Sequence, residues 1–253
     1  MMLKNRVGLV VGVANGQSIA AGCAAAFARE GAEVIVTYMN DRARPHVAPV
    51  AEAVGAVDLL PLDLSVPAQQ QAVFDAIAAR WGRLDFLLHS VAFCPREDLH
   101  GRVVDCSAGG FAQAMDISCH SFLRLARAAE PLMAAGGSLM TVSYYGAEKV
   151  VDHYNIMGPV KAALESAARN VAVELGPRGI RVNVLSPGPI ATRAASGIDG
   201  FDGLMAEARE RAPGGRLVTI DEVGAVAAFL ASDGAAGVTG TTTHIDGGRH
   251  VRM

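Results

Sequence analysis

The feature that most constrains the fold is an alternation of short apolar runs with longer alanine-rich segments along the whole chain. The first run is VGLVVGV at 7–13 and the last is TTTHID at 241–246. Several of the runs are apolar at consecutive positions, as expected for strands of a sheet that is covered on both faces. Strands that alternate with helices predict βαβ units, and therefore an α/β fold with a parallel, doubly wound sheet.

The pattern predicts about seven strands with helices between them. The expected strands are 7–13, 33–38, 57–62, 84–93, 137–143, 180–186 and 241–246, and the expected helices are 18–30, 42–54, 67–81, 110–134, 154–176 and 220–232. Because no linker-like tract or internal repeat divides the chain, we expect one domain over 1–253. The segment 187–216 is rich in Gly, Pro and Ala and interrupts the alternation, as active-site lids often do.

Composition excludes several classes of protein. Hydrophobic residues make up 51% of the chain and charged residues 19%, which indicates a well-buried globular protein. A net charge of -3 argues against a nucleic-acid partner, and no apolar run reaches the roughly 18 residues needed to span a membrane. The N-terminus lacks a signal-peptide pattern. The four cysteines form no CxxC pair and predict free thiols in a reducing cytoplasm, and the scattered histidines predict no metal site.

The first expected strand ends in GVANGQSIAAG at 12–22, where a helix should begin. A tight turn at this place directs backbone N–H groups and the positive end of the helix toward one point, which suits a pyrophosphate. Gly12 and Gly16 are present, and Ser18 stands where a third glycine is often found. Glycines also serve turns for conformational reasons alone. The position of the turn in a Rossmann-like pattern is therefore what favours nucleotide binding.

The ends of the second and third expected strands carry residues that could contact the adenosine half of a dinucleotide. Asp63, in LPLDLS, is placed to accept a hydrogen bond from an adenine amino group beside the N–H of Leu64, or to cap a turn. The second strand ends in TYMND. An acid there suits the ribose hydroxyl of NAD, and a basic residue suits the phosphate of NADP. Asp41 is followed by Arg42 and Arg44, so the residues leave both coenzymes open.

The segment YNIMGPVK places Tyr154 and Lys161 seven residues apart. A tyrosine hydroxyl can donate to an oxygen that gains negative charge, and a nearby ammonium lowers the cost of phenolate-like charge and can hold ribose hydroxyls. Pro159 lies between them and has no N–H to donate to the Asn155 carbonyl. We therefore expect the regular helix to begin near Gly158 and Pro159, or to kink there, with Tyr154 before or at the break.

Together with its neighbours, this segment resembles the short-chain dehydrogenase/reductase superfamily and, within it, the divergent branch of bacterial NADH-type enoyl-acyl-carrier-protein reductases. The common branch has its tyrosine and lysine four residues apart, and the enoyl reductases have them seven apart. The resemblance covers nearly the whole chain. Its other motifs are GVANGQSIA at 12–20, HSVAF at 89–93, SYYGAE at 143–148, GPIATRAASGI at 188–198, DEVGAVAAFLASDGAAGVTG at 221–240 and HIDGG at 244–248.

The resemblance implies a role for particular residues. Tyr154 would hydrogen-bond the thioester carbonyl and stabilise the enolate, Lys161 would hold the nicotinamide ribose, and Tyr144 would line the acyl site as a second catalytic tyrosine. Cys94 would also contact the substrate. The implied coenzyme contacts are Gly12, Ser18, Ile19, Met39, Asp63, Leu64, Ser90, Val91, Lys161, Ile190 and Thr192. Met39 stands where NADH-type members often have glutamine.

The resemblance further implies NADH as coenzyme (with NADPH possible), a substrate carried on acyl carrier protein, a cytoplasmic location and a homotetramer. Arg193 stands where the family usually has leucine, which leaves the preferred acyl chain length open. Two alternatives remain. One is a short-chain reductase for a ketone or a specialised enoyl substrate, and the other is a coenzyme-binding protein without turnover.

Overall fold

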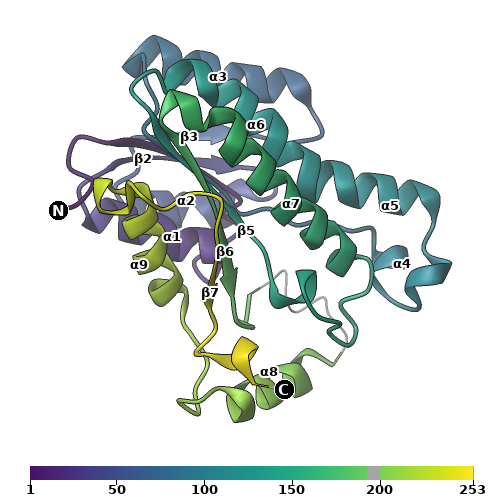
Figure 1. Ribbon diagram of the computed structural model, residues 1–253. Coiled ribbons are helices and arrows are strands. Elements are labelled where there is room, and N and C mark those ends of the chain that lie inside the picture. Colours follow the sequence, from purple (N-terminus) through teal and green to yellow (C-terminus); the bar gives the residue numbers. More distant parts are fainter. Residues whose placement is uncertain (193–199, 253) are drawn as a thin grey trace.

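The computed structural model of the chain describes residues 1–192 and 200–252, and these residues contain one seven-stranded sheet (Figure 1). The strand order is β3-β2-β1-β4-β5-β6-β7, and every neighbouring pair is parallel. The strands are β1 (Val7–Val11), β2 (Glu33–Tyr38), β3 (Asp58–Pro61), β4 (Phe86–His89), β5 (Gly137–Val142), β6 (Ile180–Pro187) and β7 (Thr242–Ile245). The predicted fold class is confirmed.

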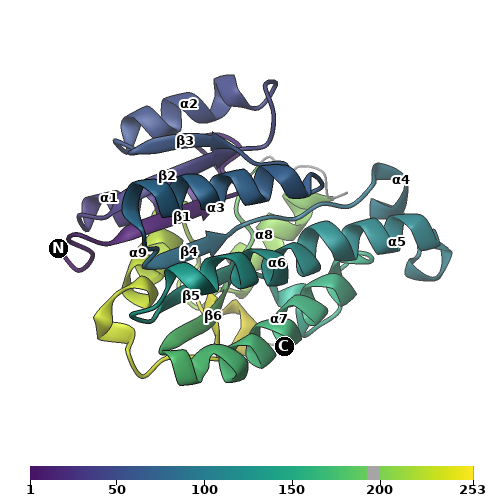
Figure 2. The same cartoon turned by 90° about the horizontal axis from the view of Figure 1, so that it is seen from above.

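Helices cover both faces of this sheet (Figures 1 and 2). The α-helices are α1 (Ile19–Arg29), α2 (Arg44–Ala53), α3 (Pro67–Trp81), α4 (Arg96–Leu99), α5 (Ala108–Met115), α6 (Ser121–Ala129), α7 (Met157–Leu175), α8 (Phe201–Arg211) and α9 (Ile220–Ala231). Helices α3, α6 and α7 pack on one face, and α1, α2 and α9 pack on the other. Along β1 the side chains alternate between the two cores, since Leu9 joins the first and Val10 the second.

Two predicted elements, a strand and a helix, have bounds that differ clearly from the observed ones. The strand predicted over 84–93 ends at His89, because the chain beyond it leaves the sheet to line a cavity. The helix predicted over 110–134 is divided by a π-helical turn at Asp116–His120, where the Ser121 hydroxyl donates to the Ile117 carbonyl at 2.6 Å. Helix α8 lies inside the predicted lid, whose Gly- and Ala-rich sequence carries little apolar periodicity.

The expectation for Pro159 is confirmed. Helix α7 begins at Met157, so Pro159 occupies its first turn, where a missing N–H costs no intrahelical bond. Asn155 has a left-handed backbone with φ 49°, which turns the chain before the helix starts. Tyr154 therefore precedes the helix and Lys161 lies inside it, so the two side chains do not share a helical stripe.

Within 1–192 and 200–252, none of the helices has the length and apolar character needed to cross a bilayer. All four cysteines are free thiols, as predicted.

Candidate active site

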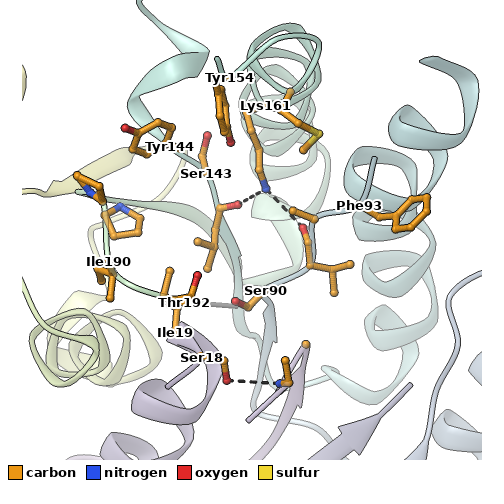
Figure 3. Close-up of a pocket in the computed structure, with 18 of the residues that line it drawn as sticks. Ser18, Ile19, Ser90, Phe93, Ser143, Tyr144, Tyr154, Lys161, Ile190 and Thr192 are labelled. Atoms are coloured by element: carbon orange, nitrogen blue, oxygen red, sulfur yellow. Dashed lines mark hydrogen bonds between the residues drawn. The ribbon is translucent and has the colours of Figure 1, made fainter. Parts of the chain in front are cut away.

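A cavity of about 340 Å³ opens at the carboxyl ends of the central strands (Figure 3). Its wall comes from the turns that follow β1, β4, β5 and β6, and from α7. In open parallel sheets this edge is where ligands bind, because the loops that leave adjacent strands in opposite directions form a crevice there. The topology therefore places loops that are distant in sequence around one space.

Most of the predicted site residues line this cavity. They are Gly12, Ser18, Ile19, Ser90, Val91, Cys94, Tyr144, Tyr154, Lys161, Ile190 and Thr192. Met39, Asp63 and Leu64 do not line it and follow strands β2 and β3. The Asp63 carboxylate accepts hydrogen bonds from the N–H and hydroxyl of Ser65, at 2.9 and 2.6 Å. That is the turn role that the sequence left open beside adenine binding.

The turn after β1 has the form expected of a phosphate cradle. Gly12 has φ 106°, and a Cβ built on it would lie 2.1 Å from the carbonyl oxygen of Ser90. Ser18 caps α1 by accepting from the N–H of Ala21 at 3.3 Å, and its hydroxyl donates to the carbonyl of Asn15. The N–H groups at the start of α1 thus face the cavity. Only glycine fits at position 12 of the turn that separates them from it.

Replacing Gly12 with alanine is expected to lower the free energy of unfolding by about 1–3 kcal/mol, because the residue would be strained in this region of φ. The clash with Ser90 would also shift the cavity wall. Gly16→Ala is the matched control, since a Cβ there meets no atom within 4 Å and Gly16 lacks a positive φ. Urea unfolding of both variants checks this, and equal stability losses would contradict it.

Lys161 joins the ends of two strands. Its ammonium donates to the carbonyl of Val142 at 2.7 Å, at the end of β5, and to that of Val91 at 3.4 Å, just beyond β4. Burial lowers the pKa of Lys161 to about 8, an effect that Cys119 and Glu165 partly offset. Lys161 therefore places a buried N–H donor at the cavity and holds together the two strand ends beside it.

Tyr154 and Tyr144 contact each other edge to face, with ring centroids 4.9 Å apart. Burial raises the pKa of the Tyr154 hydroxyl far above its usual range, and Tyr144 and Glu165 raise it further. Lys161 donates to main-chain carbonyls and is not among the groups that shift the pKa of Tyr154. Tyr154 therefore stays protonated and is suited to donating a hydrogen bond.

The two tyrosine hydroxyls point in different directions (Figure 3). The Tyr154 hydroxyl lies on the Lys161 side of the cavity, and the Tyr144 hydroxyl points away from Lys161. Burial raises the pKa of the Tyr144 hydroxyl, and the nearby Arg249 guanidinium partly offsets this. Tyr144 Oη is buried without a hydrogen-bond partner among the described residues. The geometry favours Tyr154 over Tyr144 as the donor next to Lys161.

His89, from the HSVAF motif, is buried in the core with both ring nitrogens hydrogen-bonded. Its ring nitrogens lie 2.8 Å from the hydroxyls of Thr141 and Ser121. Burial, with help from the charge of Lys161, lowers the pKa of His89 to about 3, so the imidazole is neutral at physiological pH. Its role is to hold the ends of β4 and β5 beneath the cavity.

Two groups of residues at the site were not predicted from the sequence. The first is the apolar wall of the cavity, formed by Phe93, Leu99, Met157 and Leu204. The second is Glu165, one turn after Lys161, which accepts from the hydroxyls of Ser143 at 2.5 Å and Thr242 at 3.4 Å. The i, i+4 spacing of a lysine and a glutamate was the available signal, but it is common on solvated faces and predicts no burial.

A family model described as enoyl-(acyl carrier protein) reductase matches residues 12–250. The chain belongs to this reductase family. Among its relatives is enoyl-acyl-carrier-protein reductase (NADH) 1 of Rhizobium meliloti, 46% identical over 98% of this chain and 92% of its own. Enoyl-acyl-carrier-protein reductase (NADH) FabI of Aquifex aeolicus is 42% identical, over 99% of this chain and 93% of its own. The family predicted from the motifs is confirmed.

Solved structures of the family agree with the fold over the whole length. That of the Anaplasma phagocytophilum enoyl-acyl-carrier-protein reductase in complex with NAD has a TM-score of 0.96 at 46% identity, and covers 99% of this chain and 96% of that one. The Bacillus cereus enzyme, solved with NADP⁺ and indole naphthyridinone, has a TM-score of 0.97 at 40% identity over 100% and 99%. The cavity described above thus lies in a fold whose family members bind either coenzyme.

Proposed function

We propose that this chain reduces the carbon–carbon double bond of a trans-2-enoyl thioester carried on acyl carrier protein, with NADH as donor, in fatty acid biosynthesis. The observation that carries the proposal is the Tyr154 hydroxyl on the Lys161 side of the cavity, at the carboxyl edge of the sheet, in a chain that the enoyl reductase family model matches over residues 12–250. The donor and the coenzyme cradle open into the same cavity.

The residues of the cavity fit a dinucleotide. Gly12 has no side chain, so a ligand can approach the backbone of the first turn closely. The N-terminus of α1 offers its N–H groups to a pyrophosphate. Lys161 offers an ammonium to ribose hydroxyls. Bound NADH supplies the hydride. The names of the relatives favour NADH, and the exposed Arg42 and Arg44 after β2 keep NADPH as a second donor to be assayed.

Tyr154 provides the electrostatic part of the reaction. A conjugated thioester accepts hydride at its β-carbon only if the charge that develops on the carbonyl oxygen is stabilised. A preorganised hydroxyl in a dry site supplies about 3 kcal/mol of that stabilisation. Its raised pKa keeps the proton on Tyr154 until the oxygen gains charge. Lys161 orients the coenzyme, and Tyr144 closes the side of the site opposite Lys161.

The apolar wall suits an acyl chain. Leu99 of α4 and Leu204 of α8 both line the cavity, as does Cys94. The segment 187–216, which we propose as the lid, contributes Pro187–Ile190, Thr192 and Leu204 to the lining. Arg193 and the middle of the lid lie outside the described residues. Preferred chain length should depend on the two leucines, because they add apolar area without polar groups.

The site should also respond to pH through Lys161. The free amine form prevails above its pKa of about 8, and the ribose contact uses the ammonium, so NADH binding above that pH requires uptake of a proton. We expect the Kd for NADH to be flat below pH 7 and to rise above pH 8, by up to about tenfold per unit. Fluorescence titrations at several pH values check this. Lys161→Met should remove the inflection.

We propose a homotetramer as the functional assembly. Apolar side chains that α5 and α7 expose would be covered in such an assembly: Phe111 of α5 is 40% exposed and Val173 of α7 is 78% exposed. Light scattering of the purified chain tests this, and a monomer at micromolar concentration would contradict it.

The function is tested by following the oxidation of NADH and NADPH with crotonyl thioesters and with simple ketones. We expect turnover of the enoyl thioester with NADH and none of the ketones. Ketone turnover without enoyl turnover would replace the proposal by the short-chain ketone reductase alternative. Tight coenzyme binding without any turnover would support a binding protein.

A further inference from the structure

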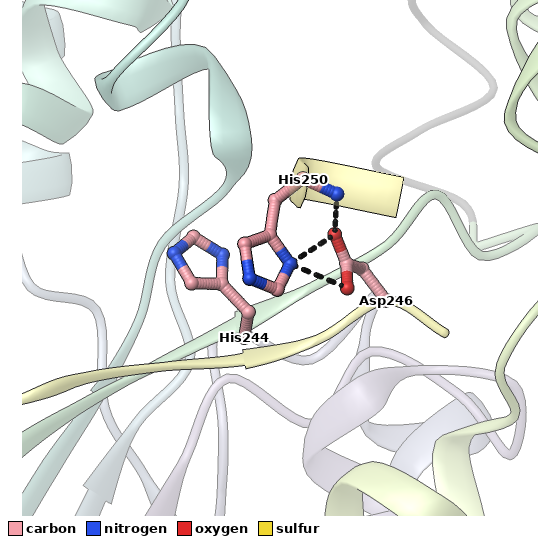
Figure 4. A group of neighbouring side chains, drawn as sticks. All are labelled: His244, Asp246 and His250. Carbon is pink, nitrogen blue, oxygen red and sulfur yellow. Dashed lines mark hydrogen bonds and ion pairs between the residues drawn. The ribbon is translucent and has the colours of Figure 1, made fainter. Parts of the chain in front are cut away.

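Three possible metal ligands gather near the C-terminus (Figure 4), and none of the three is among the residues that line the cavity. His244 is carried by β7, Asp246 follows that strand directly, and His250 lies in the 3₁₀ turn Arg249–Val251. One ligand atom from each lies within 4.8 Å of the others. This group was not predicted from the sequence, where the scattered histidines indicated no metal site.

Asp246 is fixed in place by the main chain. Its Oδ1 accepts from the N–H of Gly248 at 2.9 Å, and its Oδ2 accepts from the N–H of His250 at 2.8 Å. The residue is 8% exposed. The two carboxylate oxygens face Nδ1 of the His250 ring at 2.9 and 3.0 Å. The turn therefore holds an acid and an imidazole nitrogen together before any ligand arrives.

His244 is oriented from its other side. Its Nε2 lies 3.0 Å from Oε1 of Glu148, so a proton on Nε2 is donated to that carboxylate. This bond selects the tautomer whose Nδ1 carries a lone pair. That Nδ1 is buried and has no hydrogen-bond partner among the described residues. A carboxylate that orients a histidine while its second nitrogen stays available is the arrangement that supports metal-ligating histidines in many proteins.

The two imidazole rings stack, with centroids 4.0 Å apart and planes 14° from parallel. Two protonated rings would repel each other at this distance, whereas two neutral rings each offer a lone pair. Two imidazoles and one carboxylate, with a fourth position left to water, are the donor set of many zinc sites. Ligand atoms around zinc lie about 3.4 Å apart, so the separations of up to 4.8 Å would shorten, and the two stacked rings would tilt toward each other, when both nitrogens bind one ion.

We propose that His244, Asp246 and His250 bind a divalent cation of the Zn²⁺ and Co²⁺ class, with Glu148 orienting His244. The site would connect the end of β7 and the C-terminal turn to the segment that follows Tyr144. Arg249, between two of the ligands, already lies over the Tyr145 ring at 5.6 Å. Metal binding should therefore stabilise the packing around that turn. This proposal does not depend on the proposed function.

The test is a titration of tag-free, chelator-treated protein with Co²⁺ and then Zn²⁺. We expect one equivalent of Co²⁺ to bind with the intense visible absorption of a four-coordinate site, Zn²⁺ to abolish that absorption, and the melting temperature to rise with Zn²⁺. His250→Gln and His244→Gln should each weaken Zn²⁺ binding by more than about 100-fold, and Glu148→Gln by about 10- to 100-fold.

The matched control is His120→Gln. His120 pairs with Asp116 at 3.2 Å with the same spacing of four residues, but Arg124 binds the same carboxylate and would repel a cation. Unchanged Zn²⁺ affinity is expected there. Melting temperatures of the metal-free variants show whether each one folds, and the exposed position of Glu148 makes its variant the safest. Absence of Co²⁺ and Zn²⁺ binding, or binding that survives both histidine substitutions, would overturn the proposal.

Discussion

Replacing Tyr154 with phenylalanine is expected to lower kcat on an enoyl thioester by about 100- to 1000-fold, with NADH affinity close to that of the wild type. The substitution keeps the ring and its edge-to-face contact with Tyr144, and removes only the hydroxyl. Because that hydroxyl acts on the charge that develops during the reaction, the loss should fall on kcat more than on KM. Steady-state kinetics with crotonyl thioester, and a separate NADH titration, measure both quantities.

Tyr145→Phe is the control for this experiment. Tyr145 is the next residue after Tyr144, its ring meets His244 edge to face, and it does not line the cavity. Loss of its hydroxyl should leave kcat near the wild-type value. Wild-type turnover by Tyr154→Phe would remove Tyr154 from the mechanism, and an equal loss in both variants would point to a disturbed loop instead of a missing donor.

Replacing Lys161 with alanine is expected to raise the Kd for NADH by about 10- to 100-fold and to lower turnover as well. A hydrogen bond from a charged group contributes about 1.5–3 kcal/mol, and the ribose contact would be lost. The variant would also leave the carbonyls of Val142 and Val91 without their donor, so the floor of the cavity would loosen. Isothermal titration with NADH measures the change in affinity.

Lys161→Met separates the charge from the packing. Methionine fills nearly the same volume without an ammonium, so it avoids the cavity that alanine creates. We expect both variants to bind NADH weakly. Wild-type coenzyme affinity in Lys161→Met would contradict the role assigned to the ammonium and would leave only a packing role for this residue.

Much of the fold could be predicted, because parallel strands that are buried on both faces have apolar residues at consecutive positions. EVIVTY gave the bounds of β2 directly, and Pro159 located the start of α7 because a proline tolerates only the first turn of a helix. The break between α5 and α6 could not be predicted in this way. It depends on a π-helical turn that Asp116–His120 adopt within a continuous apolar stripe, and local propensity carries no sign of it.

The candidate site, like the fold, could be predicted only in part. The residues that meet in the cavity could be predicted, because they belong to motifs in which glycine, tyrosine and lysine stand at fixed spacings. Glu165 and the group around Asp246 escaped prediction, because their significance comes from burial and from contacts between distant segments. For Asp63, the structure supplies a turn partner, and its adenine contact stays a prediction.

The central claim, that hydride reaches the β-carbon while Tyr154 stabilises the carbonyl oxygen, is tested most directly by isotope transfer. The protein is incubated with crotonyl thioester and NADH that carries deuterium at the transferring position of the nicotinamide, and the product is examined by NMR. We expect a saturated thioester with one deuterium on the β-carbon, formed far more slowly by Tyr154→Phe. Deuterium on the carbonyl carbon, or a product formed equally fast by Tyr154→Phe, would contradict it.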